Sequence, residues 1–578
     1  MTKPAINQLG SVGLMLDGDP TMIPDQAFTD VLNVRFNGRE IEQCLGNQWE
    51  PYYTLTADGT QWEPITWLIE PVIFDGFSNG ARLLFYLAWV QMDDAGTMSA
   101  AIYKQNMTTP SFSYVATIEG WTDSPWAAYK GQINNCPFFG MEGQSPVGKQ
   151  YDWTTFSTLP GWGEQTDGTQ TTATRRWSCK KMIAFDNRLL LLNTTEESAG
   201  GADVPYPTRV RWSGFCQENA FPINWDDTAA NRTPEEYAAA VIDGYAGWQD
   251  LTSDSQLIDA CANGSTLYVY TERETFALTP TGNDQAPFLT KLVYSDLGLL
   301  DLGCAVNAKG YNYVFTGSDV IRHDSVSWKS IADGVCREWL SALVADAEPG
   351  MVRLLSYPEL NEIWVMCKGD DQESGDYAKT MALTYNYING TWSRRTLPYI
   401  YDAAFVPLAP DSDLIPVAWD GNDTAWDDER SAWDNGARKV SQGAMVGSCA
   451  STGIYYLNAG YKEHRHVYSA GAWAMVEQDI QCYVEKRGME FSIGNRSMIQ
   501  ATYLNGKGTD PLTVSLGRAD NPDGGYTWES QKIDQLYTQR RQTWRTEGEA
   551  FGYHLEINGK GSIPVGITFT TIDTGAAY

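Results

Sequence analysis

Short runs of apolar and aromatic residues, separated by polar turns, recur along most of the chain. A turn that contains Asn or Gly precedes many of these runs, and a second run ending in an aromatic residue follows. Short apolar runs bounded by turn-forming residues are typical of β-strands. Few segments have the spacing of an amphipathic helix. The clearest runs are residues 82–90, 182–193, 207–215, 265–282, 311–325, 361–369 and 380–398.

These paired runs return at intervals of about 40–60 residues, close to the length of one four-stranded propeller blade. The repeats are degenerate, so a series of β-sandwiches is the alternative. From about residue 450 the pattern changes, because apolar and polar positions there alternate with a period of two. Such alternation predicts half-buried antiparallel strands, and about seven of them fit one β-sandwich.

The sequence therefore predicts a mainly β protein with a β-propeller-like domain and a C-terminal antiparallel β-sandwich. A length of 578 residues is too great for one core, which favours several domains. Aromatic residues make up 12% of the chain, and they pack well on pleated surfaces. The expected divisions are an N-terminal extended arm or closing strands (1–55), the propeller-like domain (56–410), a Trp-Asp-rich linker or loop (411–449) and the sandwich (450–578).

Acidic residues are concentrated in the larger part of the chain. The net charge is −31, and residues 1–450 hold 29 basic and 58 acidic side chains, a net of −29. Tight binding of nucleic acid needs clustered Lys and Arg, so this balance disfavours it. Two interpretations stay open: a charged surface that keeps the protein soluble, or a surface that must not hold a passing polyanion.

The cysteines and apolar stretches predict an intracellular origin without a membrane anchor. The ten cysteines are scattered without a C-x-x-C pair, which indicates reduced core residues and not a zinc site or a disulfide framework. No apolar run is long enough to span a bilayer. The first 20 residues lack the continuous apolar stretch of an export signal, so maturation in a cytosol is expected.

Motifs for catalysis and metal binding are scarce. The four histidines are His323, His464, His466 and His554, and they show no recognisable ligand spacing. No P-loop, H-E-x-x-H or G-x-S-x-G motif occurs. DGGYTW (523–528) matches the core of a sialidase-type Asp box, which is a folding device. Acidic pairs for glycoside hydrolysis cannot be chosen among 72 carboxylates. We predict no catalytic residue, no metal and no cofactor, and thus no enzyme.

The segment AWDGNDTAWDDERSAWDNG (418–436) repeats Ala-Trp-Asp three times, seven residues apart. Turn-forming residues between the repeats argue against a heptad helix. Propeller WD signatures recur at about 40 residues and not at seven. A calcium loop stays an alternative, since Asp420, Asn422 and Thr424 occupy alternate positions, although Ala425 stands where an EF-hand needs glycine. The favoured interpretation is a polar loop, whose tryptophans pack on their own sheet or on a neighbouring subunit or tail partner. Trp419, Trp426 and Trp433 are therefore the predicted contact residues.

Several strings resemble the hub and nozzle proteins of short-tailed bacteriophages, described as packaged-DNA stabilisation proteins or tail tubular protein B. In the middle of the chain, a tight turn precedes Phe276, a Gly-Ser-Asp turn precedes Val320, and SIADGV leads into a short helix ending in Trp339 and Leu340. The resemblance covers about two thirds of the chain. The similar segments are residues 25–49, 265–282, 311–340, 384–398 and 539–559.

This resemblance implies a structural component of the virion tail, assembled in the host cytoplasm. Such proteins form a homo-oligomeric ring, usually of six copies. The ring lies below the portal and adaptor, meets tail fibre or needle proteins, closes the genome exit and conducts double-stranded DNA during ejection. A lumen lined with carboxylates would repel phosphate over a Debye length, about 8 Å at physiological salt, so that DNA slides without being held. The alternative is a β-propeller tail-fibre or spike protein that binds or cleaves host glycans.

Overall fold

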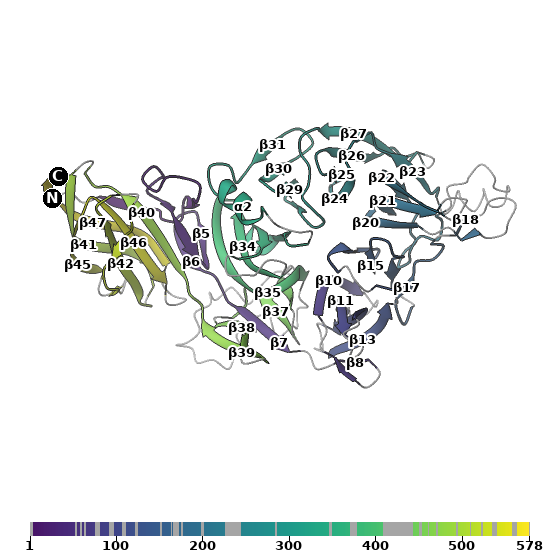
Figure 1. The fold of residues 1–578 in the computed structure, drawn as a ribbon, viewed down its shortest axis with the longest axis horizontal. Coiled ribbons are helices and arrows are strands. Elements are labelled where there is room, and N and C mark those ends of the chain that lie inside the picture. Colours follow the sequence, from purple (N-terminus) through teal and green to yellow (C-terminus); the bar gives the residue numbers. More distant parts are fainter. Residues whose placement is uncertain are drawn as a thin grey trace.

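The chain folds almost entirely into antiparallel β-sheets, as a computed structural model shows (Figure 1). Its described residues contain one α-helix, α2 (Arg337–Leu343). No helix in this part of the chain is long and apolar enough to cross a membrane. The structure describes residues 4–576 except 52–54, 58–59, 63–64, 75–80, 92–97, 107–110, 119, 122–124, 151–152, 163, 166–172, 175–176, 198–201, 226–243, 284–285, 346–349, 370–377, 408–442, 450–452, 461, 470–471, 493–494, 509, 522–523, 535–539 and 558–562.

Five four-stranded antiparallel meanders follow one another along the chain, and we number them blades 1 to 5. Blade 1 is β10 (Ile65–Phe74), β11 (Ala81–Gln91), β12 (Met98–Asn106) and β13 (Ser111–Ile118); blade 2 is β14 (Ala128–Ile133), β15 (Cys136–Met141), β16 (Val147–Gly148) and β17 (Ser157–Thr158); blade 3 is β20 (Trp177–Phe185), β21 (Arg188–Glu197), β22 (Asp203–Trp212) and β23 (Gly247–Asp250); blade 4 is β24 (Leu257–Asn263), β25 (Thr266–Thr271), β26 (Thr275–Pro280) and β27 (Phe288–Tyr294); blade 5 is β28 (Ala305–Ala308), β29 (Tyr311–Phe315), β30 (Val320–His323) and β31 (Trp328–Ser330).

Two further blades share the long strand β35 (Thr391–Pro407). Residues 391–396 of β35 pair with β34, whereas residues 403–407 pair with β36. Blade 6 is β32 (Arg353–Tyr357), β33 (Glu362–Cys367), β34 (Lys379–Asn386) and the first half of β35. Blade 7 is the second half of β35, β36 (Gly443–Cys449), β37 (Gly453–Leu457) and β7 (Asn47–Pro51).

The first strands of the seven blades contact one another in a closed circle. β10, β14, β20, β24, β28, β32 and β35 follow in that order, and β35 contacts β10 again. Figure 1 shows the blades arranged around this centre. The prediction of a β-propeller-like domain is therefore confirmed, and the described strands form seven blades.

Hydrophobic cores lie between successive blades, and those from blade 4 to blade 6 merge into one larger core. This packing explains the unbroken apolar runs of the sequence. In β21, Leu189 and Leu191 pack toward blade 2, whereas Leu190 and Leu192 pack toward blade 4. β11 behaves in the same way, because its side chains alternate between a core with blade 7 and a core with blade 2. A strand that is covered on both faces needs apolar residues at every position, not at alternate ones.

The N-terminal part of the chain closes the propeller. β7 supplies the outermost strand of blade 7, and its Asn47 faces Leu457 across the antiparallel pair with β37. The other strands of that blade lie some 350 residues or more later in the sequence. β37 also lies beyond the expected boundary at residue 450, so the propeller extends further along the chain than the pattern indicated.

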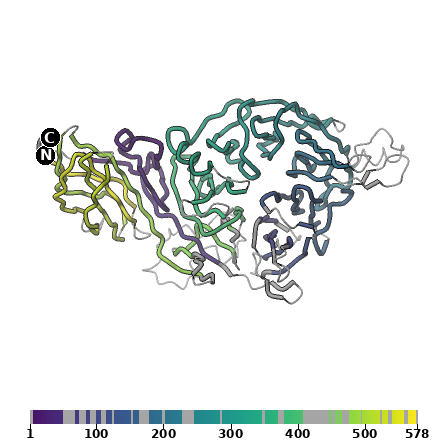
Figure 2. Tube along the Cα trace, viewed as in Figure 1, coloured from purple at the N-terminus to yellow at the C-terminus, as the bar shows by residue number. Residues whose placement is uncertain are grey.

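The second domain is an antiparallel β-sandwich built from both ends of the chain, which lie side by side (Figure 2). Its core joins Val484, Phe551 and Leu555 of one sheet to Ile567 and Phe569 of the other. One sheet has the order β1 (Ala5–Asn7), β47 (Ile563–Ala576), β41 (Asn495–Lys507), β45 (Arg541–Gly548); the other has β4 (Asp30–Leu32), β40 (Tyr483–Met489), β46 (Ala550–Ile557), β42 (Leu512–Ala519), β43 (Thr527–Trp528), with β44 (Lys532–Asp534) beside β42.

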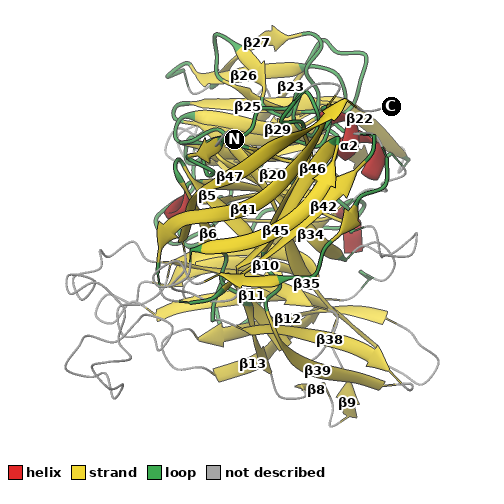
Figure 3. Cartoon of the chain, turned by 90° about the vertical axis from the view of Figure 1, so that its left-hand side faces the viewer, coloured by secondary structure: helices red, strands yellow, loops and turns green. Residues whose placement is uncertain are grey.

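The predicted sandwich is thus confirmed, but its composition differs from the prediction in two ways. Its C-terminal strands begin with β40 and not at residue 450. The N-terminal segment adds β1 to one sheet and β4 to the other. Residues 458–482 instead carry a hairpin, β38 (Lys462–Ser469) and β39 (Ala472–Asp479), which continues the blade 7 sheet beyond β7 (Figure 3).

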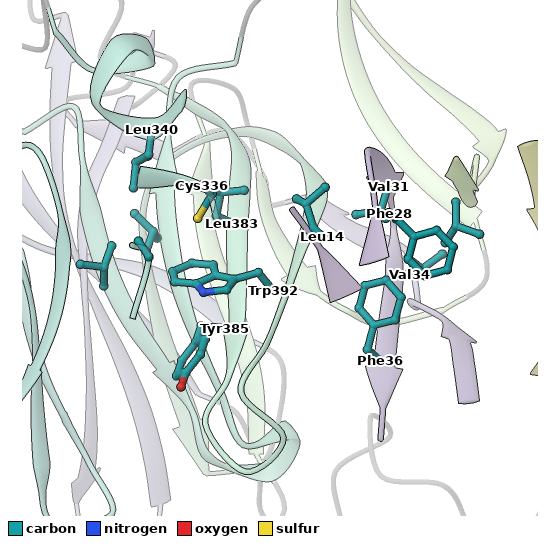
Figure 4. Close-up of a cluster of buried hydrophobic side chains, with 14 of the residues drawn as sticks. Leu14, Phe28, Val31, Val34, Phe36, Cys336, Leu340, Leu383, Tyr385 and Trp392 are labelled. Atoms are coloured by element: carbon teal, nitrogen blue, oxygen red, sulfur yellow. The ribbon is translucent and has the colours of Figure 1, made fainter. Parts of the chain in front are cut away.

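The two domains share one core, so they are not joined by a simple linker. Figure 4 shows Trp392 and Tyr385 of blade 6 near Leu14, with Phe28 and Phe36 beyond. Trp392 also donates a hydrogen bond from Nε1 to the carbonyl of Ile331, 2.8 Å away. This part of the core includes the N-terminal strands β2 (Gly13–Leu14), β3 (Ala27–Phe28), β5 (Val34–Asn37) and β6 (Glu40–Gln43).

The helix α2 is held by the N-terminal segment as well. The carboxylate of Asp17 accepts hydrogen bonds from the backbone N–H groups of Glu338 and Trp339, at 2.9 and 3.0 Å. These groups lie in the first helical turn, where N–H donors have no partner within the helix. Leu340 of the same helix is fully buried. The short helix expected after SIADGV is confirmed, but it ends at Leu343 and not at Leu340.

Candidate functional sites at the propeller axis and on its outer strands

Buried charged side chains gather where the first strands of the blades meet. Four are acidic and four are basic, so their formal charges balance. Six of the eight are buried, and the other two, Lys130 and Lys181, are half-buried. We call this set the axial charge cluster: Glu70, Lys130, Lys181, Asp259, Asp301, Arg353, Lys379 and Asp402.

Ion pairs in the cluster link different blades, one distant in sequence and one consecutive. Nζ of Lys130 lies 2.6 Å from Oδ2 of Asp402, which joins blade 2 to blade 7. Nζ of Lys181 lies 3.2 Å from Oδ1 of Asp259, which joins blade 3 to blade 4. Burying a charge is unfavourable unless it is paired and hydrogen-bonded, so these contacts allow the charges to stay at the axis.

Backbone groups satisfy the remaining charges. Asp259 accepts a hydrogen bond from the N–H of Gly303, and Asp301 accepts one from the N–H of Gly350, at 2.8 and 2.6 Å. Lys379 donates to the carbonyls of Gly350 and Tyr401, each at 2.6 Å. The cluster therefore ties the loops of blades 4 to 7 together.

Burial changes the protonation of two members of the cluster. It raises the pKa of Glu70 to about 7, with Asp402 adding to the effect and Lys130 opposing it. Burial also lowers the pKa of Lys379 to about 7, and the neighbouring Arg353 adds to this. The pKa of Asp402 stays below its ordinary value, because Lys130 and Arg353 together outweigh the effect of burial. The axis thus contains two groups that titrate near neutral pH.

Three of the four axial carboxylates serve as structural ties. A glycosidase uses two carboxyl groups that flank the bond to be cleaved, one to donate a proton and one to act as base or nucleophile. Here Asp259, Asp301 and Asp402 are engaged by lysines or by backbone N–H groups. The sequence analysis missed this cluster. A single charge in an apolar strand, such as Glu70 in ITWLIEPVIF, was its only local signal.

His323 lies buried between blades 4 and 5 and makes neutral contacts. Its Nε2 is 2.8 Å from the hydroxyl of Tyr270, and the rings of Tyr268, Tyr270 and Tyr294 surround it at 5.1–5.8 Å. Burial lowers the pKa of His323 to about 4. His323 is therefore a neutral hydrogen-bonding residue of the core at physiological pH.

His554 lies on the sandwich between two glutamates. Its Nδ1 is 2.9 Å from Glu485 and its Nε2 is 3.5 Å from Glu556. Burial would raise the pKa of Glu485, but hydrogen bonds and charges from His554 and Arg487 hold it below its ordinary value. Within the described ranges no group of three or more His, Cys, Asp or Glu is arranged to hold a metal ion.

The remaining histidines and cysteines are mostly structural. Nδ1 of His464 accepts a hydrogen bond from the N–H of Trp49, and the side chain of His466 lies outside the described residues. Nine cysteines are described and all are free thiols; eight are buried and Cys261 is half-buried. The prediction that the cysteines are small core residues is confirmed for these nine.

Two other features of the sequence can be placed only in part. Trp419, Trp426 and Trp433 lie outside the described residues, so their predicted contact role stays a prediction.

The DGGYTW motif is described only from Gly524 onward, because Asp523 also lies outside the described residues. Trp528 of that motif pairs through β43 with β42, and its ring packs against Gly517 and Gly552, where no side chain would fit beneath it.

The outermost strands of blades 3, 4 and 5 expose large apolar side chains. Val326, in the turn before β31, is 86% exposed, and Leu289 on β27 is 64% exposed. We call the set the outer belt: Trp248 on β23, Leu289 and Leu292 on β27, and Val326 and Trp328 at β31.

Hydrogen bonds join the strands of the outer belt laterally. Nε2 of Gln249 on β23 donates to Oγ1 of Thr290 on β27, 2.9 Å away. The hydroxyl of Tyr294, at the end of β27, donates to the carbonyl of Asp324 beside Val326, 2.6 Å away. The exposed apolar residues therefore belong to one continuous wall of the propeller, at the arc where Figure 1 labels β23, β27 and β31.

Comparisons with known proteins give no relative of established function. No family model matches the sequence, and no curated protein matches it. Solved structures are similar to it only weakly. The extracellular domain of the putative one-component system BT4673 from B. thetaiotaomicron is 9% identical, with a TM-score of 0.35, over 91% of this chain and 58% of that chain. This chain therefore spans less than two thirds of that one.

Two further solved structures are similar at the same level. AztD from Citrobacter koseri is 9% identical with a TM-score of 0.27, over 89% of this chain and 99% of that chain. An exo-β-1,3-galactanase from Phanerochaete chrysosporium is 8% identical with a TM-score of 0.21, over 72% of this chain and 96% of that chain. Similarity this low says nothing about the activity of the present chain.

Proposed function

We propose that the chain is a structural subunit of a closed homo-oligomeric ring in the tail of a short-tailed bacteriophage. In this role the ring closes the genome exit and conducts double-stranded DNA during ejection. The observation that carries the proposal is the outer belt, a continuous wall with five exposed large apolar side chains. Exposed apolar surface of this kind is typical of sites where proteins associate.

The resemblance to hub and nozzle proteins, in the middle of the chain, indicates the kind of assembly in which this association would occur. Phe276, Val320 and Trp339, which belong to the similar strings, lie in β26, in β30 and in α2. These elements belong to blades 4 and 5 and to the connection that follows. The strings that resemble hub and nozzle proteins therefore fall in the part of the propeller that carries most of the outer belt.

The charge balance fits a conduit better than a nucleic-acid binder. A net charge of −31 repels phosphate and prevents the many Lys and Arg contacts on which tight, salt-dependent DNA binding rests. The four acidic groups of the axial charge cluster are matched in number by four basic ones, and Asp259 and Asp402 pair directly with lysines, so most of the unbalanced charge lies elsewhere. A ring of such subunits would let DNA pass without retaining it.

A glycan-binding or glycan-cleaving tail appendage is the other function considered. Cleavage would require accessible paired carboxylates. All four axial carboxylates are buried, and Asp259, Asp301 and Asp402 are engaged by lysines or backbone N–H groups, which favours the structural role. A glycan array, probed with the purified chain, separates the two functions. Binding to a defined oligosaccharide by a chain that stays monomeric would favour the appendage.

The outer belt can be tested directly. Trp328→Ser and Leu289→Ser replace exposed apolar side chains with small polar ones, so both variants should fold normally. We expect them to assemble less well than the wild-type chain in sedimentation velocity experiments. Ile533→Ser, an equally exposed apolar position on the sandwich at 62%, is the matched control. Unchanged assembly of both belt variants would remove the main support for the proposal.

A further inference from the structure

The β38–β39 hairpin forms an exposed ribbon at the edge of blade 7. β39 pairs with β38 alone, so its outer edge has no strand partner among the described residues. All five residues from Met475 to Asp479 are exposed, including Met475 (37%) and Val476 (42%). A two-stranded hairpin is only marginally stable by itself in water, and a free edge with exposed apolar residues favours pairing with another surface.

The ribbon and the outer belt have complementary chemistry. Both expose apolar side chains, Met475 and Val476 on the ribbon and the belt residues on the propeller. Asp479 is 91% exposed and Glu477 is 52% exposed, and both lie near Lys462, which leaves this end of the ribbon with one negative charge.

The charges on the two main belt strands have the opposite sign. Lys291 is the only charged residue of β27, and Lys329 is the only charged residue of β31. Both are exposed, and neither forms an ion pair with any described residue. The strands β27 and β31 therefore offer two unpaired positive charges beside their apolar side chains, whereas Asp250 on β23 pairs with Arg209 and Asp324 beside Val326 accepts backbone hydrogen bonds.

The two surfaces lie at opposite sides of the molecule. In Figure 1 and, from a perpendicular direction, in Figure 3, β27 is at the top and the β38–β39 ribbon is near the bottom. The ribbon cannot reach the belt of its own chain. Two unlike, complementary surfaces on opposite sides of a subunit produce head-to-tail contacts, and such contacts close into a ring when the rotation allows it.

We propose that the β38–β39 ribbon of one copy docks on the outer belt of the next copy and forms the repeated contact of the ring. This inference rests on the proposed function, because it names the interface by which the ring assembles. The occupant of the belt is a second copy of this chain. Apolar residues of the ribbon cover Leu289 and Leu292, and the acidic end of the ribbon meets Lys291 and Lys329.

Site-directed cross-linking tests the contact in the full-length chain. Leu289→Cys and Met475→Cys, combined in one chain, place one thiol on each surface. Under mild oxidation or with a short bismaleimide, we expect a ladder of covalent oligomers. Each single substitution should give none. The matched control combines Met475→Cys with Ile388→Cys, because Ile388 is 58% exposed in the turn between β34 and β35 and lies off the belt.

Charge reversal tests the same contact without cysteines. Lys291→Glu and Asp479→Lys should each weaken assembly at least about tenfold, because like charges then face each other across the interface. The double variant should recover assembly, since the pair is restored in reversed order. Lys507→Glu, at a 71% exposed lysine of the sandwich, is the control and should assemble as the wild-type chain does.

The outcomes separate this inference from the proposed function. A cross-linked ladder together with rescue by the double variant supports the interface. If the wild-type chain forms a ring, but the double-cysteine chain gives no ladder and Lys291→Glu assembles normally, the proposed interface is overturned and the ring stands. A wild-type chain that stays monomeric, both alone and with tail partners, overturns both. Cross-links from the belt to a tail partner, and not to a second copy, also overturn the inference.

Discussion

Nζ of Lys130 and Oδ2 of Asp402 are 2.6 Å apart, although 272 residues separate them in the sequence. The pair joins blade 2 directly to blade 7. The N–H of Ile69 in blade 1 also donates to Asp402, so three blades meet at this carboxylate. The contact lies next to the point where the last blade returns to the first. It therefore adds an electrostatic tie to the closure that β7 makes at the outer edge.

Removing the charge of Asp402 should destabilise the protein. In Asp402→Asn the ammonium of Lys130 loses its carboxylate while it remains mostly buried, and breaking a buried pair in this way costs about 3 kcal/mol. Urea unfolding followed by tryptophan fluorescence measures the change. Asp520→Asn is the control, since the Asp520 side chain is 76% exposed and its substitution should change the free energy of unfolding by less than about 0.5 kcal/mol. Equal stabilities of the two variants would contradict the structural role of the pair.

Closure of the propeller by β7 can be tested at Gln48. The N–H of Trp49 points away from β37 toward His464, so the N–H of Gln48 faces β37. Gln48→Pro removes this donor and should cost about 2 kcal/mol or more. Hydrogen exchange in β37 should rise as well. Gln48→Thr keeps the N–H and is the control. The closure would be disproved by a proline variant that exchanges as slowly as the threonine variant.

His323 should make the protein less stable in acid. Its pKa of about 4 in the folded state lies below the ordinary value of 6.5. Between pH 4 and 6.5 the unfolded chain therefore binds more protons, and the free energy of unfolding falls as the pH is lowered through this range. The total loss is roughly 3 kcal/mol, at about 1.4 kcal/mol for each pH unit.

The variant His323→Gln isolates this contribution from that of the carboxylates. Glutamine can still bond to Tyr270 but does not titrate, so its stability should fall less than that of the wild-type chain from pH 6.5 to 4. Identical pH profiles for the two proteins would show that His323 is not buried as a neutral group.

Glu70 should act in the opposite direction. Its pKa is raised to about 7 from an ordinary value of 4.5, so the folded state binds more protons between these pH values. Its contribution to stability is present below pH 4.5 and is lost as the pH rises through 7. Glu70→Gln stays neutral and should be more stable than the wild-type chain at pH 8, by up to about 3 kcal/mol. The difference should disappear near pH 4. A variant that is less stable at pH 8 would show that Glu70 is favourably charged at the axis.

The local elements of the fold could be predicted because each strand carries its own pattern. The run of four leucines in β21 indicates a strand covered on both faces, and SIADGV marks the start of α2. The seventh blade was harder to predict, because β7 and β37 pair across more than 400 residues. The predicted boundary of the sandwich at residue 450 was wrong for the same reason. β1 and β4 join it from the other end of the chain, and no periodicity reveals a distant partner.

The candidate sites depend even more on tertiary contacts. Lys130 and Asp402 are ordinary charges in the sequence and become neighbours only when the blades close. Leu289 and Trp328 look like core residues in a strand pattern. Their exposure follows from the position of β27 and β31 as the last strands of their blades. Scarcity of catalytic motifs and the acidic balance, in contrast, were visible from the composition alone.

The mass of the assembled full-length chain tests the central claim most directly. Native mass spectrometry, combined with negative-stain imaging, should be carried out on the chain alone and with candidate tail partners. The account predicts a closed ring, six-fold as the resemblance implies, with an axial opening at least as wide as double-stranded DNA. A chain that stays a monomer or a trimer under all of these conditions would contradict it.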